Sequence, residues 1–253
     1  MISLKTSKEL AAMRAAGEIT GGALRKAGEA LEPGMTTAQL DRIVHDYITS
    51  RGATPSFLGY GGFPASACIS INNEVIHGIP GKRVIHEGDI VSVDVGACYN
   101  GFHGDSAFTF ACGRISPEAQ RLLDVTQQSL YKGIEQAVPG NRLGDISWAV
   151  QQWAENAGFA VVTKYVGHGV GSGLHESPDV PNYGKAGRGV RLLPGMTIAI
   201  EPMINAVGAD VTVQPDGWTV LTKSGSLSAH FEHTIAITQN GPVILTKGRE
   251  GHV

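Results

Sequence analysis

The sequence predicts an α+β fold of two duplicated halves, in which a curved, mostly antiparallel sheet is flanked by helices. Three observations predict it: a β-hairpin pattern in the first half, amphipathic helices in both halves, and an internal repeat that runs in the same order through both. With 253 residues, the chain is long enough for one large core or for two fused halves.

The hairpin is predicted from residues 91–110. Val91 to Gly96 alternate apolar and polar residues, which is the period of a strand. Tyr99-Asn100-Gly101 then supplies a turn, since Asn and Gly tolerate a positive φ. The returning strand would make Asp94 and Asp105 cross-strand neighbours, or neighbours offset by one pair on the same face. Two carboxylates at such a short distance repel each other unless a divalent cation neutralises their charge.

Four helices are predicted from capping signals and apolar spacing. Thr6 to Glu9 form a capping box for a helix over residues 7–30, and Thr37 is expected to cap a second helix that ends at Gly52. The remaining expectations are helices at 117–136 and 143–156, a loop at 54–64, strands at 65–71 and from 160 onward, and turns at 215–217 and 240–241.

The repeat links the two halves residue by residue. Its first part matches Pro33-Gly34, Leu40, Val44, Tyr47 and Gly52 to Pro139-Gly140, Ile146, Val150, Trp153 and Gly158. Its second part matches His77-Gly78 to His168-Gly169, Asp94 to Glu201, and Asp105 to Glu232. An ordered series of this kind indicates a duplication. Residues 1–253 are therefore expected to form a single domain with repeat halves at about 7–112 and 116–246.

The duplication turns one pair of acidic residues into two pairs that should meet in one cleft. Asp94, Asp105, Glu201 and Glu232 carry too much charge for a cleft unless metal ions are present, and His168 joins them. One His with carboxylates suits Mn, Fe, Co or Zn better than Ca, and such a set can hold two ions about 3.5–4 Å apart. Taken singly, each of these residues could instead be a solvated strand end or turn residue.

Composition excludes several other classes of function. The net charge of −3 offers no basic field for nucleic acid or an anionic membrane, and no run of residues has the length of a membrane span or the pattern of a signal peptide. The three cysteines indicate a reducing cytosol and no disulfide framework. His77 and His175 lie in Gly- and Pro-rich loops, where they are either acid–base groups or solvated side chains.

Seven motifs of the chain are specific as a set: 71–80 (INNEVIHGIP), 93–96 (VDVG), 104–107 (GDSA), 167–171 (GHGVG), 174–176 (LHE), 201–202 (EP) and 231–234 (FEHT). Together they resemble the type I methionine aminopeptidases, which have the "pita-bread" metallopeptidase fold. The resemblance runs from the first helix to Thr246. It implies a cytoplasmic hydrolase that removes the initiator methionine from nascent proteins when the second residue is small.

The resemblance also implies roles for individual residues. The metal ligands would be Asp94, Asp105, His168, Glu201 and Glu232, with Asp94 and Glu232 bridging two ions of Co, Mn, Fe(II) or Zn. A metal-bridging hydroxide would attack the Met carbonyl while one metal binds the free α-amino group.

The remaining implied roles concern the substrate. Glu201 would shuttle the proton, and His77 and His175 would hydrogen-bond the substrate amide and the developing tetrahedral species. The pocket for the Met side chain would be lined by Phe57, Tyr60, Phe63, Cys68, Leu174 and Trp218.

The chain departs from the family pattern in its pocket. Phe63 replaces an expected Tyr, Leu174 replaces an expected aromatic residue, and the position of Phe57 often holds a smaller residue, so the pocket's fine shape is expected to differ. No N-terminal Cys/His zinc module is expected, and the interval from Glu201 to Glu232 is too short for the helical subdomain of type II enzymes. The implied partners are nascent N-termini and a transient ribosome contact, and the chain is expected to be a monomer.

Two other interpretations compete with this one. A proline-specific aminopeptidase or prolidase would use the same metals, but such relatives generally carry an extra N-terminal domain. A metal-free binding module, or a metal-independent hydrolase resembling creatinase, would have lost ligand residues, whereas all five are present here.

Overall fold

The longest strands are β4 (Ile90–Tyr99) and β5 (Phe102–Ala111), which form the predicted hairpin in a computed structural model that describes residues 2–247. Asn100 and Gly101 make the two-residue turn with φ values of 51° and 78°. Asp94 lies opposite Ala107, and Asp105 lies opposite Gly96. The two carboxylates therefore project from one face, offset by one pair, as the second of the two predicted arrangements requires.

The four predicted helices are present. Thr6 and Glu9 form the predicted capping box. The prediction that Thr37 caps the second helix is wrong by one residue, because Thr36 accepts from the Gln39 amide and Thr37 is already helical. The helices are α1 (Ser7–Ala30), α2 (Thr37–Ser50), α3 (Pro117–Glu135) and α4 (Leu143–Asn156).

The remaining elements are short strands and one 3-10 turn. The predicted loop at 54–64 contains β1 (Thr54–Pro55), which pairs with β4, and the 3-10 turn η1 (Tyr60–Gly62). The turn expected at 240–241 is made by residues 239–240, since Gly241 already pairs with Thr238. The other strands are β2 (Ala67–Ile71), β3 (Glu74–Ile76), β6 (Ala160–Val161), β7 (Gly167–Gly169), β8 (Glu176–Val180), β9 (Thr197–Ile200), β10 (Met203–Asn205), β11 (Val211–Val213), β12 (Val220–Thr222), β13 (Ser228–His230), β14 (His233–Thr238) and β15 (Gly241–Ile244).

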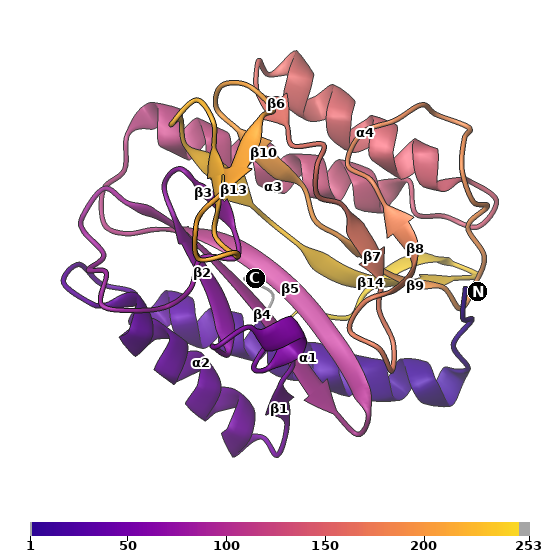
Figure 1. The fold of residues 1–253 in the computed structure, drawn as a ribbon. Coiled ribbons are helices and arrows are strands. Elements are labelled where there is room, and N and C mark those ends of the chain that lie inside the picture. The colour runs from indigo at the N-terminus through magenta and orange to yellow at the C-terminus, as the bar shows by residue number, and fades with distance from the viewer. Residues whose placement is uncertain (1, 248–253) are drawn as a thin grey trace.

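All strand pairs within residues 2–247 are antiparallel, as predicted. The largest sheets are β1-β4-β2 with β5 on the other side of β4, and β15-β14-β9-β7-β8. Two smaller sheets, β13-β10-β6 and β11-β12-β3, complete the architecture. The hairpin of the first half thus lies beside the main sheet of the second half, with β5 facing β13 and β14 (Figure 1).

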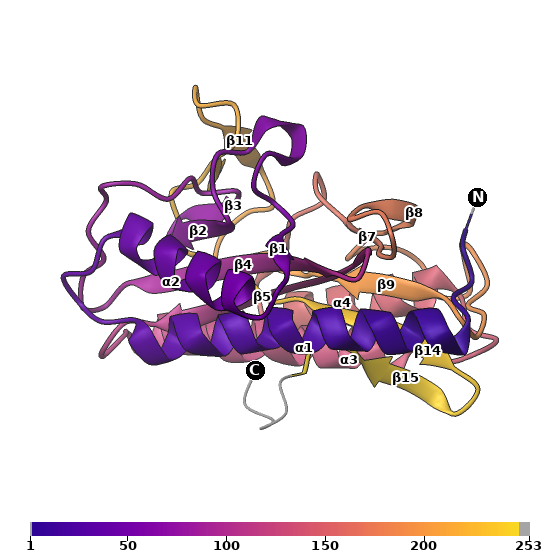
Figure 2. The ribbon, with the colours of Figure 1, turned by 90° about the horizontal axis from the view of Figure 1, so that it is seen from below.

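Helices α1, α3 and α4 lie on one side of the β4–β5 hairpin, and several short strands lie on the other. Figure 2 shows these three helices below the hairpin and β3, β8 and β11 above it. Helix α1 crosses β5 where Gly17 meets Gly104, and a Cβ on Gly104 would lie 2.8 Å from the Gly17 Cα. No helix within residues 2–247 is long and apolar enough to cross a membrane.

The sequence repeat recurs as a repeat of backbone hydrogen bonds. In the first half the amides of Gly34, Thr37 and Ala38 donate to the carbonyls of Ile85, Arg83 and Gly81; in the second half the amides of Gly140, Leu143 and Gly144 donate to those of Leu192, Val190 and Arg188. Donors are shifted by 106 residues (140 − 34) and acceptors by 107 (192 − 85). The matched glycines also share a conformation, with φ of 95° at Gly34 and 96° at Gly140. The two halves therefore have the same local architecture.

Side-chain hydroxyls join the two halves along β5. The Thr234 hydroxyl accepts from the Asp105 amide at 3.0 Å and donates to the Asp105 carbonyl at 2.7 Å. The Ser106 hydroxyl donates to the Glu232 carbonyl at 2.6 Å, and the Glu232 amide donates to Ala107. Thr109 bonds both backbone groups of His230 in the same way. We call this row of hydroxyl-mediated bonds the seam.

We predict that Thr234→Val weakens the seam. The substitution keeps the side-chain shape but leaves two buried backbone groups of Asp105 unpaired, which should cost about 1–3 kcal/mol of unfolding free energy. Urea unfolding measures this cost. Thr238→Val on the same strand is the control, because its hydroxyl also bonds two backbone groups, the Gly241 carbonyl and the Asn240 amide, but does so at the solvent-accessible hairpin end. Equal losses in the two variants would contradict a special role for the seam.

Candidate metal centre and substrate cavity

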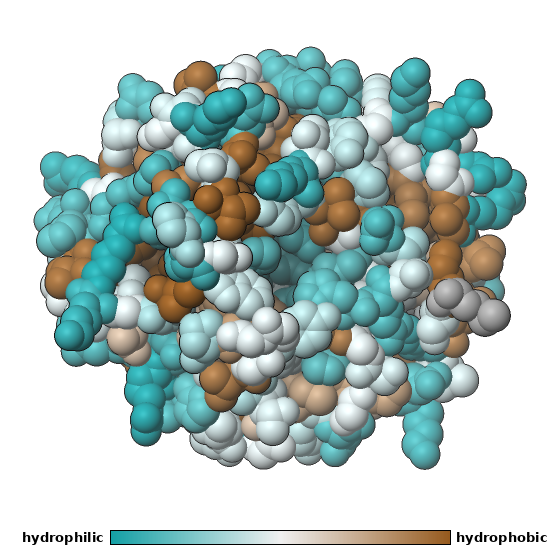
Figure 3. All heavy atoms as spheres, viewed as in Figure 1, coloured by the Kyte–Doolittle hydropathy of each residue, from teal (hydrophilic) through white to brown (hydrophobic). Residues whose placement is uncertain are grey.

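Five acidic or imidazole side chains from five places in the fold converge on one cavity. Asp94 and Asp105 come from β4 and β5, His168 from β7, Glu201 from the residue after β9, and Glu232 from the break between β13 and β14. The cavity has a volume of about 270 Å³ and opens on the side of the strands opposite α1, α3 and α4, where Figure 3 shows a hollow in the middle of the surface. The pairing predicted from the repeat is thus present in space.

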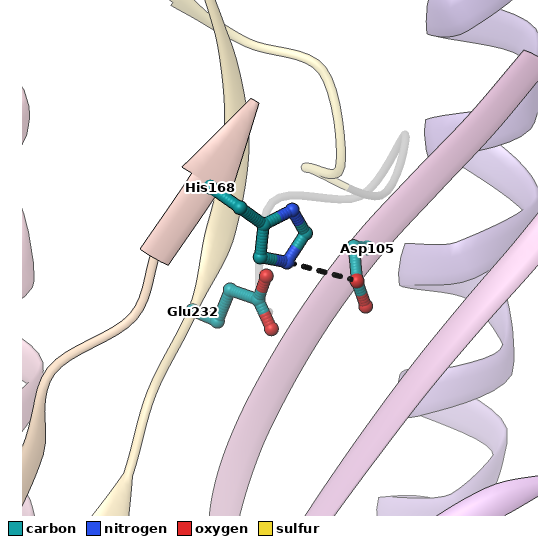
Figure 4. Close-up of side chains that lie close together, drawn as sticks. All are labelled: Asp105, His168 and Glu232. Carbon is teal, nitrogen blue, oxygen red and sulfur yellow. Dashed lines mark ion pairs between the residues drawn. The ribbon is translucent and has the colours of Figure 1, made fainter. Parts of the chain in front are cut away.

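His168 directs a lone pair at the carboxylates. Its Nδ1 lies 2.9 Å from the Gly169 carbonyl, which can only accept, so Nδ1 carries the proton and Nε2 does not. Nε2 lies 3.6 Å from Asp105 Oδ2 and 3.5 Å from Glu201 Oε1, and Figure 4 shows it facing Asp105 and Glu232. Burial lowers the pKa of His168 to about 4, so the ring is neutral at pH 7. A neutral lone pair beside carboxylates calls for a cation between them.

The carboxylates themselves lack partners. Asp94 Oδ1, Asp105 Oδ1 and Glu232 Oε1 are buried and have no hydrogen-bond donor among the described residues. Burial, together with the charge of neighbouring carboxylates, raises the pKa of Asp94 to about 7. Burial alone raises the pKa of Glu201 to about 8. The pKa values of Asp105 and Glu232 are raised well above their usual range by burial and by the other acidic groups.

The spacing and the chemistry of these side chains suit a metal ion. Ligand atoms of Asp105, His168 and Glu232 lie within 4.8 Å of one another, close enough to share one ion. Unpaired buried carboxylate oxygens and an imidazole lone pair are the donor set that divalent transition metals favour, whereas Ca²⁺ takes oxygen ligands only. The residues present therefore fit a divalent cation.

The two loop histidines lie at the same cavity. His77 follows β3 in a left-handed conformation with φ of 59°, and burial lowers its pKa to about 4. His175 precedes β8, and its ring contacts the His168 ring in a tilted arrangement with centroids 4.1 Å apart. Its Nδ1 hydrogen-bonds the Tyr60 hydroxyl at 2.9 Å. Both imidazoles thus line the same cavity as the carboxylates.

An apolar pocket adjoins the acidic floor. Phe57, Phe63, Cys68 and Leu174 form a buried cluster, and Trp218 meets Phe63 edge-on at 5.1 Å. Burial raises the pKa of the Cys68 thiol well above its usual range, so the thiol adds to the apolar wall. All thirteen residues predicted for the site line this single cavity.

Supporting residues that the sequence analysis did not identify hold the site in place. The Lys5 ammonium pairs with the Glu176 carboxylate at 2.6 Å, and the Lys5 side chain is only 4% exposed. The same carboxylate also accepts a hydrogen bond from the Gly173 amide. Asn182 donates to the Glu201 carbonyl at 3.0 Å. Lys5 and Glu176 are 171 residues apart, so no local pattern in the sequence could reveal their contact.

Comparison with known proteins finds relatives of this chain among metallopeptidases. The model of "Metallopeptidase family M24" matches residues 11–239. A methionine aminopeptidase of Clostridium acetobutylicum is 56% identical over 97% of this chain and 99% of its own length. Methionine aminopeptidase 1 of Bacillus subtilis is 52% identical over 98% of this chain and 100% of its own.

Solved structures agree with the sequence relatives. The methionine aminopeptidase of Rickettsia prowazekii superposes with a TM-score of 0.96 at 43% identity, over 97% of this chain and 100% of that one. A prolidase from Pyrococcus furiosus shares the fold, with a TM-score of 0.78 at 24% identity. This chain covers only 66% of that prolidase, so the likeness there is one of fold alone.

We predict that the metal-free protein loses stability as the pH rises from about 7 to about 8.5. In this window the folded state still holds protons on Asp94 and Glu201, whereas the unfolded chain has released them near pH 4. A folded state that binds more protons is destabilised by raising the pH, here by about 1–2 kcal/mol. Histidines oppose this decline only near pH 7, where the unfolded chain still holds part of their protons, and they contribute little above about pH 7.5.

Thermal unfolding in EDTA measures this decline, and addition of a divalent metal should abolish it because the bound carboxylates are ionised throughout. Glu201→Gln is the matched control and should show a shallower decline, since it removes one of the retained protons. Metal-free stability that is constant or rising over this range would contradict the prediction.

Proposed function

The chain belongs to metallopeptidase family M24, and we propose that it is a methionine aminopeptidase. It hydrolyses the first peptide bond of proteins that begin with methionine and whose second residue is small. One observation carries the proposal: an acidic centre fit for divalent cations lies directly beside an apolar pocket in the same cavity of about 270 Å³. A free N-terminus can reach the cations while its side chain fills the pocket, so only the first bond is presented for cleavage.

The residues that would hold two divalent cations of Co, Mn, Fe(II) or Zn are Asp94, Asp105, His168, Glu201 and Glu232. Their support is the unpaired buried oxygens and the His168 lone pair described above. When bound, the cations supply a water nucleophile that is acidic near neutral pH and polarise the scissile carbonyl.

The chain's own groups orient the substrate and move protons. Glu201 takes the proton of the attacking water and delivers it to the leaving amine. Its carboxylate lines the cavity between His168 Nε2 at 3.5 Å and His230 Nε2 at 3.7 Å. His77 and His175 hydrogen-bond the substrate amide and the oxygen that gains charge. His77 is held for this role by edge-on contacts with Tyr165 and Trp218.

The apolar pocket selects methionine. Phe57, Phe63, Cys68, Leu174 and Trp218 offer only carbon and sulfur surface to an unbranched thioether side chain. Tyr60 lies across the mouth against His175, which narrows the space beside the scissile bond and favours a small second residue.

We extend the proposal to the setting of the enzyme. Residues 1–253 act as a single catalytic domain built from halves at about 7–112 and 116–246, whose supporting evidence is the repeated hydrogen bonds. The enzyme works as a monomer in the cytoplasm on nascent N-termini, with a transient ribosome contact.

We predict that EDTA-stripped protein regains release of Met from Met-Ala-Ser when Mn, Co, Fe(II) or Zn is added back singly. Free methionine is measured by amino-acid analysis, and Xaa-Pro dipeptides are assayed in parallel. Cleavage of Xaa-Pro in place of Met-Ala-Ser would assign the chain to the proline-specific branch. Absence of cleavage with every metal would favour a binding module.

We predict that His175→Ala keeps its metal but loses turnover roughly 10²- to 10⁴-fold, the usual contribution of a group that assists proton or charge transfer. Asp94→Asn is the contrasting variant, which should stay folded but lose most of its metal. Metal content by elemental analysis, circular dichroism and kcat separate the two. Loss of metal in His175→Ala, or a metal-replete and active Asp94→Asn, would overturn the assigned roles.

A further inference from the structure

One hydrogen bond at the cavity mouth joins the two halves of the molecule. The Tyr60 hydroxyl lies 2.9 Å from His175 Nδ1, and the two ring centroids are 5.1 Å apart. Tyr60 belongs to η1 in the first half, whereas His175 precedes β8 in the second. A side chain of the first half therefore influences the orientation and the protonation of an imidazole in the second half.

Chemistry decides which partner donates. A tyrosine hydroxyl can donate or accept, and so can a neutral imidazole nitrogen, depending on its tautomer. A bare imidazole nitrogen is far more basic than a phenol oxygen, and a phenol is more acidic than an imidazole N–H. The favoured bond therefore runs from Tyr60 Oη–H to His175 Nδ1, which leaves the ring proton of His175 on Nε2.

The neighbouring histidine is held in the opposite form. The His168 ring contacts the His175 ring with centroids 4.1 Å apart, but the His168 Nδ1 faces the Gly169 carbonyl and must donate. His168 thus presents a lone pair at Nε2, and His175 presents a proton there. The first suits a metal ligand, and the second suits a donor to a carbonyl oxygen.

We propose that Tyr60 is a positioning residue that fixes the Nε2–H tautomer of His175, so that His175 donates a hydrogen bond to the substrate oxygen. This inference rests on the proposed aminopeptidase function. Without the hydroxyl, His175 would populate the Nδ1–H tautomer as well, and its Nε2 lone pair would then face an oxygen that can only accept.

The loop that carries Tyr60 is built to hold the hydroxyl in place. At one end the Ser56 hydroxyl bonds His103 Nδ1 at 2.9 Å, and at the other Phe63 packs against Trp218. Between these anchors Gly59 and Gly61 have φ values of 83° and 56°, a conformation that lets the chain reverse tightly beneath the tyrosine. Tyr60 itself is 47% exposed, so its position depends on these anchors and on its bond to His175.

The direct test is NMR of metal-loaded protein labelled with ¹⁵N-histidine, because the two tautomers have distinct nitrogen shifts. His175→Ala identifies the resonances. We expect wild type to show Nε2–H at His175, and Tyr60→Phe to show a mixture of tautomers. Nδ1–H in wild type, or an unchanged tautomer in Tyr60→Phe, would overturn the proposal.

Kinetics and metal binding give the second readout. Tyr60→Phe keeps the ring, so we expect KM to stay within about twofold while kcat on Met-Ala-Ser falls roughly tenfold, and the metal Kd from calorimetry to be unchanged. A raised KM with unchanged kcat would instead assign Tyr60 to substrate binding alone and overturn the proposal.

Tyr131→Phe is the matched control. It also removes a tyrosine hydroxyl, but Tyr131 lies on α3, is 37% exposed and does not line the cavity, and its hydroxyl has no hydrogen bond within residues 2–247. We expect it to leave kcat and the His175 tautomer unchanged, and an equal kcat loss in both variants would overturn the specific role of Tyr60. Failure of the aminopeptidase function itself would show separately, as a wild type that releases no methionine.

Discussion

The burial of four carboxylates in one small cavity is the constraint on which the rest of the structure depends. Unpaired charges in such a place are costly, and the raised pKa values of Asp94 and Glu201 express that cost in the metal-free chain. A cation converts the repulsion into attraction, so the fold around the cavity is built to keep the oxygens together and free of other donors. The His168 lone pair, fixed by the Gly169 carbonyl, completes this arrangement.

The seam shows how the fold meets that constraint. Asp105 and Glu232 come from different halves, yet their backbones are bonded across β5 through the hydroxyls of Thr234 and Ser106. In a regular β-ladder these backbone groups would hydrogen-bond directly to the neighbouring strand, which would fix the register of the two strands. Hydroxyl-mediated bonds instead allow the strand to break between β13 and β14, where Glu232 turns toward the cavity. The stability of the interface between the halves and the geometry of the site therefore depend on the same bonds.

Local patterns in the sequence were enough to predict the hairpin, the bounds of α1 and α4 and, through the repeat, the five residues at the acidic floor. Features that depend on distant partners were not predictable. β1 is two residues long and is a strand only because it pairs with β4. Thr36 and Thr37 are both plausible caps, and only the fold selects Thr36. The Lys5–Glu176 pair spans most of the chain and has no local signature.

The matched histidines show how a duplicated scaffold acquired distinct functional groups. His77 and His168 occupy equivalent places in the repeat, and each is followed by glycine. His168 lies in extended β7, so its ring reaches the carboxylates. His77 follows β3 with a φ of 59°, and its ring meets Tyr165 and the cavity-lining Trp218 edge-on. The two equivalent positions thus differ in backbone conformation and in what their imidazoles face, while the repeated hydrogen bonds keep both halves in the same frame.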